Sequence, residues 1–472
     1  MTKNKKAAHM PYGAYHKTTI PAHDPELAST DPGTPMGEVM RKQWQPVCMS
    51  EQLTDVPKAI RIMGEDLVAF RDRSGNIGVL QRHCSHRGTS LEYGIIQPKG
   101  IRCCYHGWVY DVDGTILEMP AEPKDSKIYE TVYHGAYPAQ ERDGLVFAYM
   151  GPPEEKPAFP DFDSYHRPDG NKLVPMSAFH TCNWLQVYEN IMDHLHVGLL
   201  HDPSMMSVEG VDASEIKDMD YAAPMGFTEQ PALDWVPTRD GNGMCFIACR
   251  RNPDQQTVWV RILETIFPNY LQIGCTFPSV RTSRRSQTVW TRWHVPVDDE
   301  NMLVIGWRHF NDEVDPLHLG REEDVGLEKL DFLGGVVGGR SYEEGQRAPG
   351  DYEALTSLRA IAVHALENSG YSDTGVYMCR KLLRDLVQGK TPSHKSLQLQ
   401  EGDENRLHTY SQDSVMNLPK EPGKDDHEAM RGLGQQILQI MQEADGVPSN
   451  TREEYIHARF DELDGGYLQA AE

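Results

Sequence analysis

Two short clusters of cysteine and histidine constrain this chain more than any other feature. Cys84 and His86 form the first cluster, and Cys103 and His106 form the second. Zinc sites with two cysteines and two histidines usually pair like residues within each cluster. Here each cluster supplies one thiolate and one imidazole, and a glycine follows each one closely. The pattern favours two loops that supply ligands of both kinds to one metal centre.

A second group of metal-ligand residues lies in the segment 183–203, which contains Asp193, His196 and His201. Two imidazoles and a carboxylate form the facial triad that binds non-haem Fe(II) and leaves positions open for O2 and substrate. Residues five apart do not share one face of a regular helix, so we expect the helix to end or bulge between His196 and His201. Asp193 is placed to orient the His196 imidazole. We interpret His194 as structural or pocket-lining.

The two clusters together resemble the large (α) subunit of Rieske non-haem iron aromatic ring-hydroxylating oxygenases, in the phthalate-dioxygenase-like branch. The resemblance spans about residues 40–390. It implies that a Rieske [2Fe–2S] cluster is bound by Cys84, His86, Cys103 and His106, and that His196 and His201 bind a mononuclear Fe(II). It also implies that Asp193 links His196 to a cluster histidine of a neighbouring subunit, which requires a head-to-tail ring, usually a homotrimer.

The third iron ligand of this family lies far downstream, and Asp351 is the best match in the run 346–355. Gly350 precedes it, where many relatives have Glu, Gln or Asn. Glu353 is the second choice. An aspartate after Pro-Gly is also typical of a helix start, and the two interpretations of Asp351 are compatible.

The resemblance implies a terminal oxygenase that uses O2 and electrons to hydroxylate an aromatic, often carboxylated, substrate. Ring hydroxylation and oxidative O-demethylation of a methoxy-arene both remain open. No dinucleotide fingerprint or plant-type ferredoxin motif occurs, so we expect the electrons to come from NAD(P)H through a separate reductase, with or without a ferredoxin. Three strand arginines, Arg261, Arg292 and Arg308, are candidates to pair with a substrate carboxylate. A solvated strand face is the more common reason for such residues.

The alternative function is a Rieske-type electron-transfer protein without oxygenase activity. Respiratory Rieske proteins carry an extra cysteine in each loop, joined as a disulfide. Cys104 lies beside a ligand here, but the first loop has no partner cysteine. A ferredoxin would also end near residue 150 and would not explain the Asp193–His201 group. These differences favour the oxygenase.

The charge and composition of the chain limit the kinds of partner and the cell compartment that we expect for it. The net charge of −24 argues against nucleic acid or an anionic membrane as the main partner. Residues 45–110 nevertheless hold eight basic and six acidic residues, which would suit an acidic electron donor. The sequence contains no long apolar run, and it has no apolar leader near the N-terminus. Nine cysteines in a chain of this length do not indicate a disulfide scaffold. We therefore expect a cytoplasmic protein.

The order of patterns along the chain predicts an α+β fold with four segments. They are an N-terminal arm (1–43), an all-β Rieske domain (44–155), a mononuclear iron domain (156–390) and an acidic C-terminal extension (391–472). We expect long strands over 258–263, 288–293 and 303–308, in an antiparallel sheet of the helix-grip type with helices on one face. Thr451 and Glu454 predict a capping box at the start of a last helix.

Overall fold

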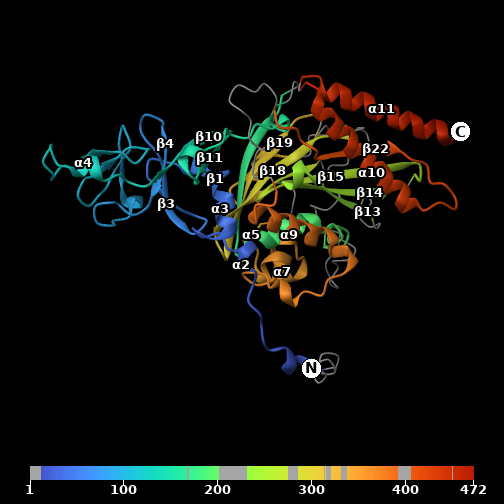
Figure 1. The fold of residues 1–472 in the computed structure, drawn as a ribbon, viewed down its shortest axis with the longest axis horizontal. Coiled ribbons are helices and arrows are strands. Elements are labelled where there is room, and N and C mark those ends of the chain that lie inside the picture. The colour runs from blue at the N-terminus through green and yellow to red at the C-terminus, as the bar shows by residue number, and fades with distance from the viewer. Residues whose placement is uncertain are drawn as a thin grey trace.

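The computed structural model of this chain describes residues 12–166, 170–200, 231–252, 254–274, 285–312, 314, 320–330, 337–391, 406–448 and 450–471. A smaller all-β part forms one end of the molecule, and a large sheet with helices forms the rest (Figure 1). The N-terminal segment adds the short helices η1 (Gly13–Lys17), α2 (Pro25–Ala28) and α3 (Pro35–Arg41).

Three small antiparallel sheets build the all-β part. The first has β1 (Trp44–Met49), β11 (Leu145–Tyr149) and β10 (Ala139–Arg142). The second has β2 (Lys58–Ile62), β3 (Glu65–Arg71), β4 (Ile77–Gln81) and β9 (Ala136–Tyr137). The third has β5 (Ile95–Ile96), β6 (Ile101–Arg102), β7 (Val109–Tyr110) and β8 (Ile116–Glu118), and the helix α4 (Ile128–Thr131) follows it. The two Cys–His clusters lie in the β4–β5 and β6–β7 loops.

One antiparallel sheet of nine strands organises the larger part. Seven of them lie in the order β12 (Lys172–His180), β19 (Asn301–Phe310), β18 (Thr288–Asp298), β16 (Tyr270–Gly274), β15 (Thr257–Ile266), β14 (Gly243–Arg251) and β13 (Ala232–Thr238). β22 (Gln412–Asn417) pairs with β15 and with β17 (Arg285–Ser286). A separate hairpin joins β20 (Val325–Gly326) to β21 (Lys329–Leu330). The three predicted long strands are confirmed as β15, β18 and β19.

Helices pack on both faces of the large sheet (Figure 1). One face carries α5 (Trp184–Glu189), η6 (Asn190–Met192), α6 (Val197–Leu200), α7 (Tyr342–Arg347), α8 (Asp351–Thr356) and α9 (Thr374–Val387). The other face carries α10 (Asp426–Glu443) and α11 (Arg452–Ala471). The α+β fold class is confirmed: the helices between residues 184 and 387 lie on one face, as expected, and two helices of the C-terminal segment cover the other.

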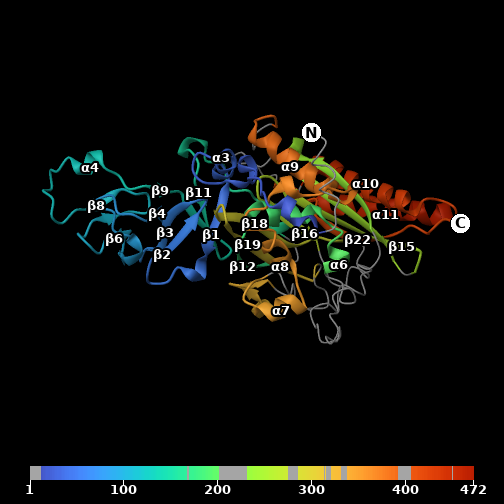
Figure 2. The same ribbon diagram turned by 90° about the horizontal axis from the view of Figure 1, so that it is seen from below.

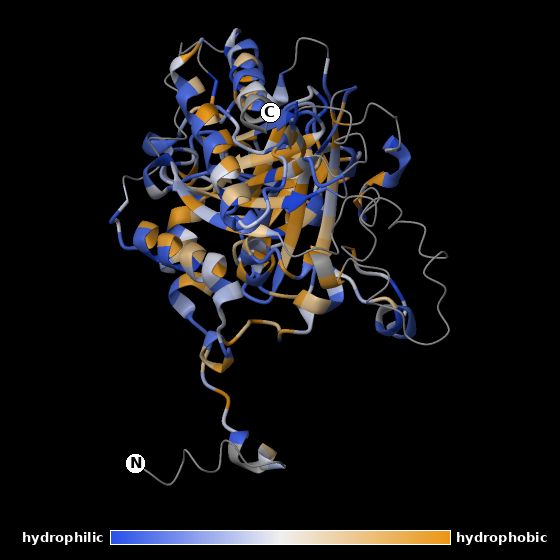
Figure 3. Ribbon diagram, turned by 90° about the vertical axis from the view of Figure 1, so that its right-hand side faces the viewer, coloured by the Kyte–Doolittle hydropathy of each residue, from blue (hydrophilic) through white to orange (hydrophobic). Residues whose placement is uncertain are grey.

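Alternation along the central strands explains the two helical layers. Phe246 and Trp259 point into the core beneath α5 and α9, whereas Ile247 and Val260 point toward α10. Successive strand side chains face opposite sides, so strands that are apolar at every position need cover on both faces. Figure 3 shows the strands of this sheet largely in the hydrophobic colour. Helices of the C-terminal segment cover the second face of the sheet. The acidic composition of this segment did not predict that packing.

The C-terminal segment is part of the large sheet and not a loose tail. β22 pairs with β15 over six residues, and the apolar side of α10 contributes Leu433, Ile437 and Met441 to the core on the outer face. The last helix begins at Arg452, directly after Thr451, as the sequence pattern predicts. None of the helices in the described ranges is both long and apolar enough to cross a membrane.

Candidate functional site

The two Cys–His loops of the all-β part have the same backbone hydrogen bonds. The Cys84 N–H donates to the carbonyl of Thr89, and the Gly88 N–H donates back to the carbonyl of Cys84. Cys103 repeats the pattern with Trp108 and Gly107. Both glycines have φ near +78°, at 79° and 76°, in the left-handed region that favours glycine. The glycine after each cluster is therefore required by the turn that presents the ligands.

The two loops bring their four side chains together. Both cysteines are buried, and the rings of His86 and His106 lie half-buried with centroids 4.6 Å apart. Burial, together with the neighbouring Cys84, raises the pKa of the Cys103 thiol. A bound cation reverses that preference, because a coordinating thiol loses its proton. Two buried sulfurs beside two accessible imidazoles fit a cluster that takes cysteine on one iron and histidine on the other.

Aromatic residues that the sequence analysis did not select support this site. Trp108 stacks on His86 with ring centroids 4.8 Å apart and an angle of 5° between the planes. The Tyr110 hydroxyl lies 3.0 Å from the Cys84 sulfur. The His134 ring lies between the Ser85 hydroxyl and the carbonyl of Gln81, and it is within hydrogen-bond distance of both. The run from Cys103 to Tyr110 already contained the first two, but only the fold shows that they touch the other loop.

Removing the Tyr110 hydroxyl is expected to lower the reduction potential of a cluster bound here. Hydrogen bonds to cluster sulfurs stabilise the reduced, more negative state and raise the potential. Tyr110→Phe keeps the ring in the core and deletes only the donor to Cys84. A spectroelectrochemical titration would measure the change, and Tyr93→Phe on the surface is the matched control. An unchanged potential in Tyr110→Phe would contradict this role.

The segment that carries Asp193 and His196 is not a continuous helix. α5 begins after Asn183, whose side chain accepts from the Leu185 N–H, and the following turn η6 ends at Met192. Asp193 has an extended backbone, and its carboxylate accepts a hydrogen bond from the Leu195 N–H at 3.2 Å. A side chain that bonds its own backbone in this way competes with the helix. The helix therefore breaks at Asp193, and the predicted change between His196 and His201 involves His201, which lies outside the described residues.

The His196 ring lies between two carboxylates. Its Nε2 is 3.6 Å from Asp351 Oδ1, and its Nδ1 is 3.8 Å from Asp193 Oδ2. α6 begins directly after His196 and α8 begins at Asp351, and Figure 2 shows both helices on the side of the large sheet that faces the viewer. His201 lies outside the described residues. The neighbouring His194 is buried with its ring 4.6 Å from that of Phe246, in keeping with a structural or pocket-lining role.

The structure distinguishes the two downstream carboxylates. Asp351 is the first residue of α8 and faces His196. Glu353 turns the other way, pairs with Arg340 and accepts from the Gly350 N–H. The chemistry of the donors around His196 fits a mononuclear iron: an imidazole nitrogen and a carboxylate oxygen face each other, and a second carboxylate is placed on the far side of the ring.

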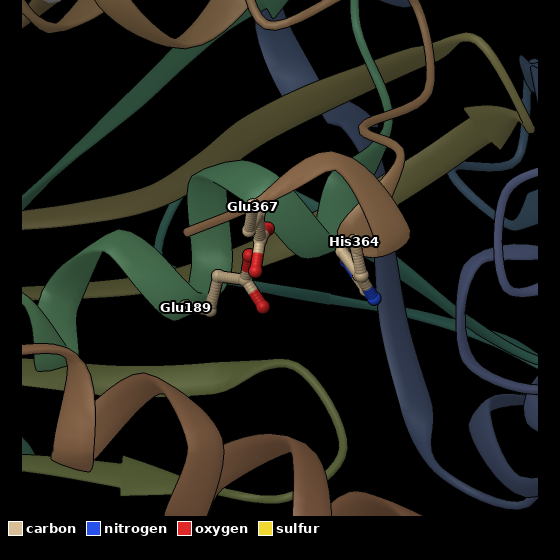
Figure 4. A group of neighbouring side chains, drawn as sticks. All are labelled: Glu189, His364 and Glu367. Atoms are coloured by element: carbon tan, nitrogen blue, oxygen red, sulfur yellow. The ribbon is translucent and has the colours of Figure 1, made fainter. Parts of the chain in front are cut away.

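A different group of metal-binding residue types lies at the helical layer, formed by Glu189, His364 and Glu367 (Figure 4). Their ligand atoms lie within 4.8 Å of one another. The Arg380 guanidinium, however, bonds both oxygens of Glu189, at 2.7 and 2.5 Å, and both oxygens of Glu367, at 2.8 and 2.6 Å. Both carboxylates are already occupied by one cation, so this group is an ion-pair network.

Comparison with known proteins identifies the family. The sequence model of the Rieske [2Fe-2S] domain family matches residues 43–134 of this chain. The chain is 54% identical over 443 residues to the oxygenase subunit of a tert-butanol monooxygenase / tert-amyl alcohol desaturase of Aquincola tertiaricarbonis, which covers 93% of each chain. The chain belongs to the Rieske non-haem iron oxygenases. It is also 35% identical to the phenoxybenzoate dioxygenase subunit alpha of Ectopseudomonas oleovorans, over 79% of this chain and 88% of that one.

Membership in this family makes the chain an oxygenase component with a Rieske [2Fe–2S] cluster and a mononuclear non-haem iron. The electron-transfer alternative is thereby disfavoured. The solved structure of NdmB from Pseudomonas putida CBB5 has the same fold, with a TM-score of 0.53 and 17% identity, over 77% of this chain and 94% of that one. The predicted Rieske oxygenase fold and enzyme class are confirmed.

Proposed function

We propose that this Rieske oxygenase hydroxylates a small tertiary alcohol, with its iron held by His196, His201 and Asp351. The observation that carries the iron assignment is the placement of His196 Nε2 opposite Asp351. Asp193, on the other ring nitrogen, orients the imidazole for that contact. Cys84, His86, Cys103 and His106 are the proposed ligands of the cluster. When bound, the iron supplies a site where O2 is activated.

The proposed substrate class rests on the relative that is 54% identical, because it covers nearly the whole of both chains. In such a reaction one C–H bond of the alcohol becomes C–OH with one oxygen atom of O2. The other oxygen leaves as water after it takes up two protons and two electrons. An aromatic carboxylic acid is the second candidate, supported by the phenoxybenzoate dioxygenase relative and by Arg292, which lies near Asp351.

The electrons are proposed to reach the chain from NAD(P)H through a separate reductase, with or without a ferredoxin. The names of the relatives, which specify an oxygenase subunit and a subunit alpha, support a system of several components. We further propose a homotrimer in which Asp193 lies next to the cluster of a neighbouring subunit, and a cytoplasmic location. The half-buried His86 and His106 leave an imidazole surface through which such contact could occur.

His196→Ala is expected to lose one of about three irons per chain while the cluster stays intact. The measurement is iron and acid-labile sulfide per chain on anaerobically purified protein, with an EPR spectrum of the reduced cluster. His364→Ala is the matched control, because His364 belongs to the group held by Arg380. Loss of iron from His364→Ala but not from His196→Ala would overturn the ligand assignment.

The substrate proposal is tested by turnover with labelled O2 and tert-butanol in the presence of a compatible reductase. One labelled oxygen in a diol product would support it. Two labelled oxygens in an aromatic product would instead support ring dihydroxylation. Formaldehyde from a methoxylated aromatic acid would support O-demethylation. Iron-replete enzyme that oxidises aromatic acids and no tertiary alcohol would contradict it.

A further inference from the structure

The break in the chain at Asp193 leaves a buried carbonyl at the end of a helical turn. Met192 ends η6 and is fully buried. The last carbonyls of a helix have no partner within it, and a buried carbonyl without a hydrogen bond is costly. The indole N–H of Trp235 donates to the Met192 carbonyl at 3.0 Å, in the interior of the chain. Trp235 on β13 therefore supplies the missing hydrogen bond directly before Asp193.

The neighbouring strand contacts the residue directly after Asp193. Phe246 on β14 is the cross-strand partner of Trp235, and the centroids of the two rings lie 6.0 Å apart. The His194 ring lies 4.6 Å from the Phe246 ring. Directly opposed residues of an antiparallel pair lie on one face of the sheet. One cross-strand pair on the inner face of the sheet thus contacts the chain immediately before and immediately after Asp193.

The Trp235 indole also lies against the backbone of α9. Gly375 is in the first turn of that helix. A Cβ added to Gly375 would lie 2.0 Å from the indole Nε1 and 2.5 Å from its Cδ1, which is closer than a real Cβ approaches another heavy atom. A larger residue at position 375 would therefore displace the indole that bonds Met192. The missing side chain of Gly375 gives the indole its place.

The other hydrogen bonds of Asp193 are local. Its N–H donates to the Asn190 carbonyl at 3.1 Å, and its carboxylate accepts from the Leu195 N–H at 3.2 Å. These bonds shape the segment but do not fix its position relative to the sheet. The Trp235 bond joins residues 43 apart in the sequence and does fix that position. Because the carboxylate is 3.8 Å from His196 Nδ1, a shift of the segment by about 1 Å would disturb the contact.

We propose that Trp235 is a positioning residue for the oxygenase reaction. Its indole holds the Met192 carbonyl and so fixes the Asp193 carboxylate beside His196. Trp235 acts through the backbone and not as a metal ligand. This inference rests on the proposed function, in which Asp193 orients the His196 imidazole, and it deepens that function by naming the side chain that places Asp193.

Trp235→Phe keeps an aromatic ring in the core and removes only the donor to Met192. We expect kcat to fall about 10-fold with little change in KM, because Asp193 acts in turnover and not in substrate binding. The substrate is the one that wild-type enzyme turns over in the labelled-O2 assay. Trp44→Phe is the matched control and should leave kcat unchanged. The Trp44 indole donates to the Pro157 carbonyl, also at 3.0 Å, but Trp44 lies on β1 in the all-β part.

Hydrogen–deuterium exchange measures the positioning without turnover and without a bound metal. The Asp193 and Leu195 amides are the reporters, because both donate hydrogen bonds within the segment that Trp235 holds. Loss of one buried hydrogen bond should make their exchange about 2- to 10-fold faster in Trp235→Phe. Their exchange should be unchanged in Trp44→Phe.

Gly375→Ala is a second variant that reaches the same contact from α9. Its methyl group would displace the indole, so it should lower kcat and speed the exchange of the same amides as Trp235→Phe does. Gly432→Ala is its matched control, because Gly432 lies in α10 with open space around the position of an added Cβ. Gly375→Ala decides the question if Trp235→Phe does not fold.

A double variant separates an action through Asp193 from a general loss of packing. If Trp235 acts through Asp193, then Trp235→Phe should lower kcat no further in an Asp193→Asn background. A further fall of similar size in that background would overturn the inference. An unchanged kcat in Trp235→Phe that carries its iron and cluster would also overturn it, as would an equal fall in Trp44→Phe. Normal turnover by Asp193→Asn alone would instead contradict the proposed function.

Discussion

Replacing Asp193 with asparagine is expected to reduce kcat by at least about 10–100-fold while both metal centres remain bound. The Asp193 carboxylate lies 3.8 Å from Nδ1 of His196, on the side of the ring away from Asp351. Asparagine has nearly the same shape but no charge, so it cannot stabilise the imidazole in the same way. Steady-state turnover, measured beside iron content and the cluster EPR signal, separates loss of activity from loss of metal.

Asp234→Asn provides the matched control for that experiment. Asp234 lies on β13 and accepts a hydrogen bond from Gln435 of α10, on the face of the sheet opposite the helices that adjoin His196. The same loss of one carboxylate charge there should leave kcat unchanged. Normal turnover in Asp193→Asn would show that the carboxylate has no role in catalysis. Loss of iron in Asp193→Asn would show that Asp193 binds the iron or holds an iron ligand in position.

Replacing Arg380 with methionine is expected to destabilise the folded chain by about 3–5 kcal/mol. Arg380 and Glu189 are both buried, and one guanidinium binds the carboxylates of Glu189 and Glu367. Removing the arginine leaves the buried Glu189 charge without compensation, and this is the costly step. The network also ties α9 to the end of α5, which the turn η6 separates from Asp193. The midpoint of denaturant unfolding, followed by tryptophan fluorescence, measures the loss.

Glu367→Gln is the comparison variant for this ion-pair network, because Glu367 is partly exposed and Arg380 would still pair with Glu189. It should cost much less than Arg380→Met. Equal and small effects of both variants would contradict the view that the network stabilises α5 and α9. An increase in bound metal in Arg380→Met would show that Arg380 excludes a cation from Glu189, His364 and Glu367.

Local patterns predicted the strands correctly because the causes of strand formation are local. The β15, β18 and β19 strands follow from runs of apolar and β-branched residues with turn signals between them. The glycine after each Cys–His pair follows from the left-handed turn that each loop makes. The break at Asp193 was not predicted, because it comes from a side-chain contact with the Leu195 N–H and not from the histidine spacing.

Contacts between distant segments could not be predicted in the same way. The pairing of β22 with β15 and the position of α10 on the outer face depend on which strands adjoin, and an acidic composition does not encode that. The same applies to Arg261, Arg292 and Arg308. All three are strand arginines in the sequence, but only Arg292 adjoins Asp351, and Arg261 is near Asp413 from a segment about 150 residues away.

The sequence by itself determined the family of this protein: the residue types and spacings of Cys84, His86, Cys103 and His106 predicted a mixed-ligand Rieske cluster, and the relatives confirm the family. Tertiary structure decided which groups meet. It placed Asp351, and not Glu353, opposite His196, and it brought Tyr110 to Cys84. The physical reason is that ligand identity is a property of single side chains, whereas proximity depends on strand pairing and packing across the whole chain.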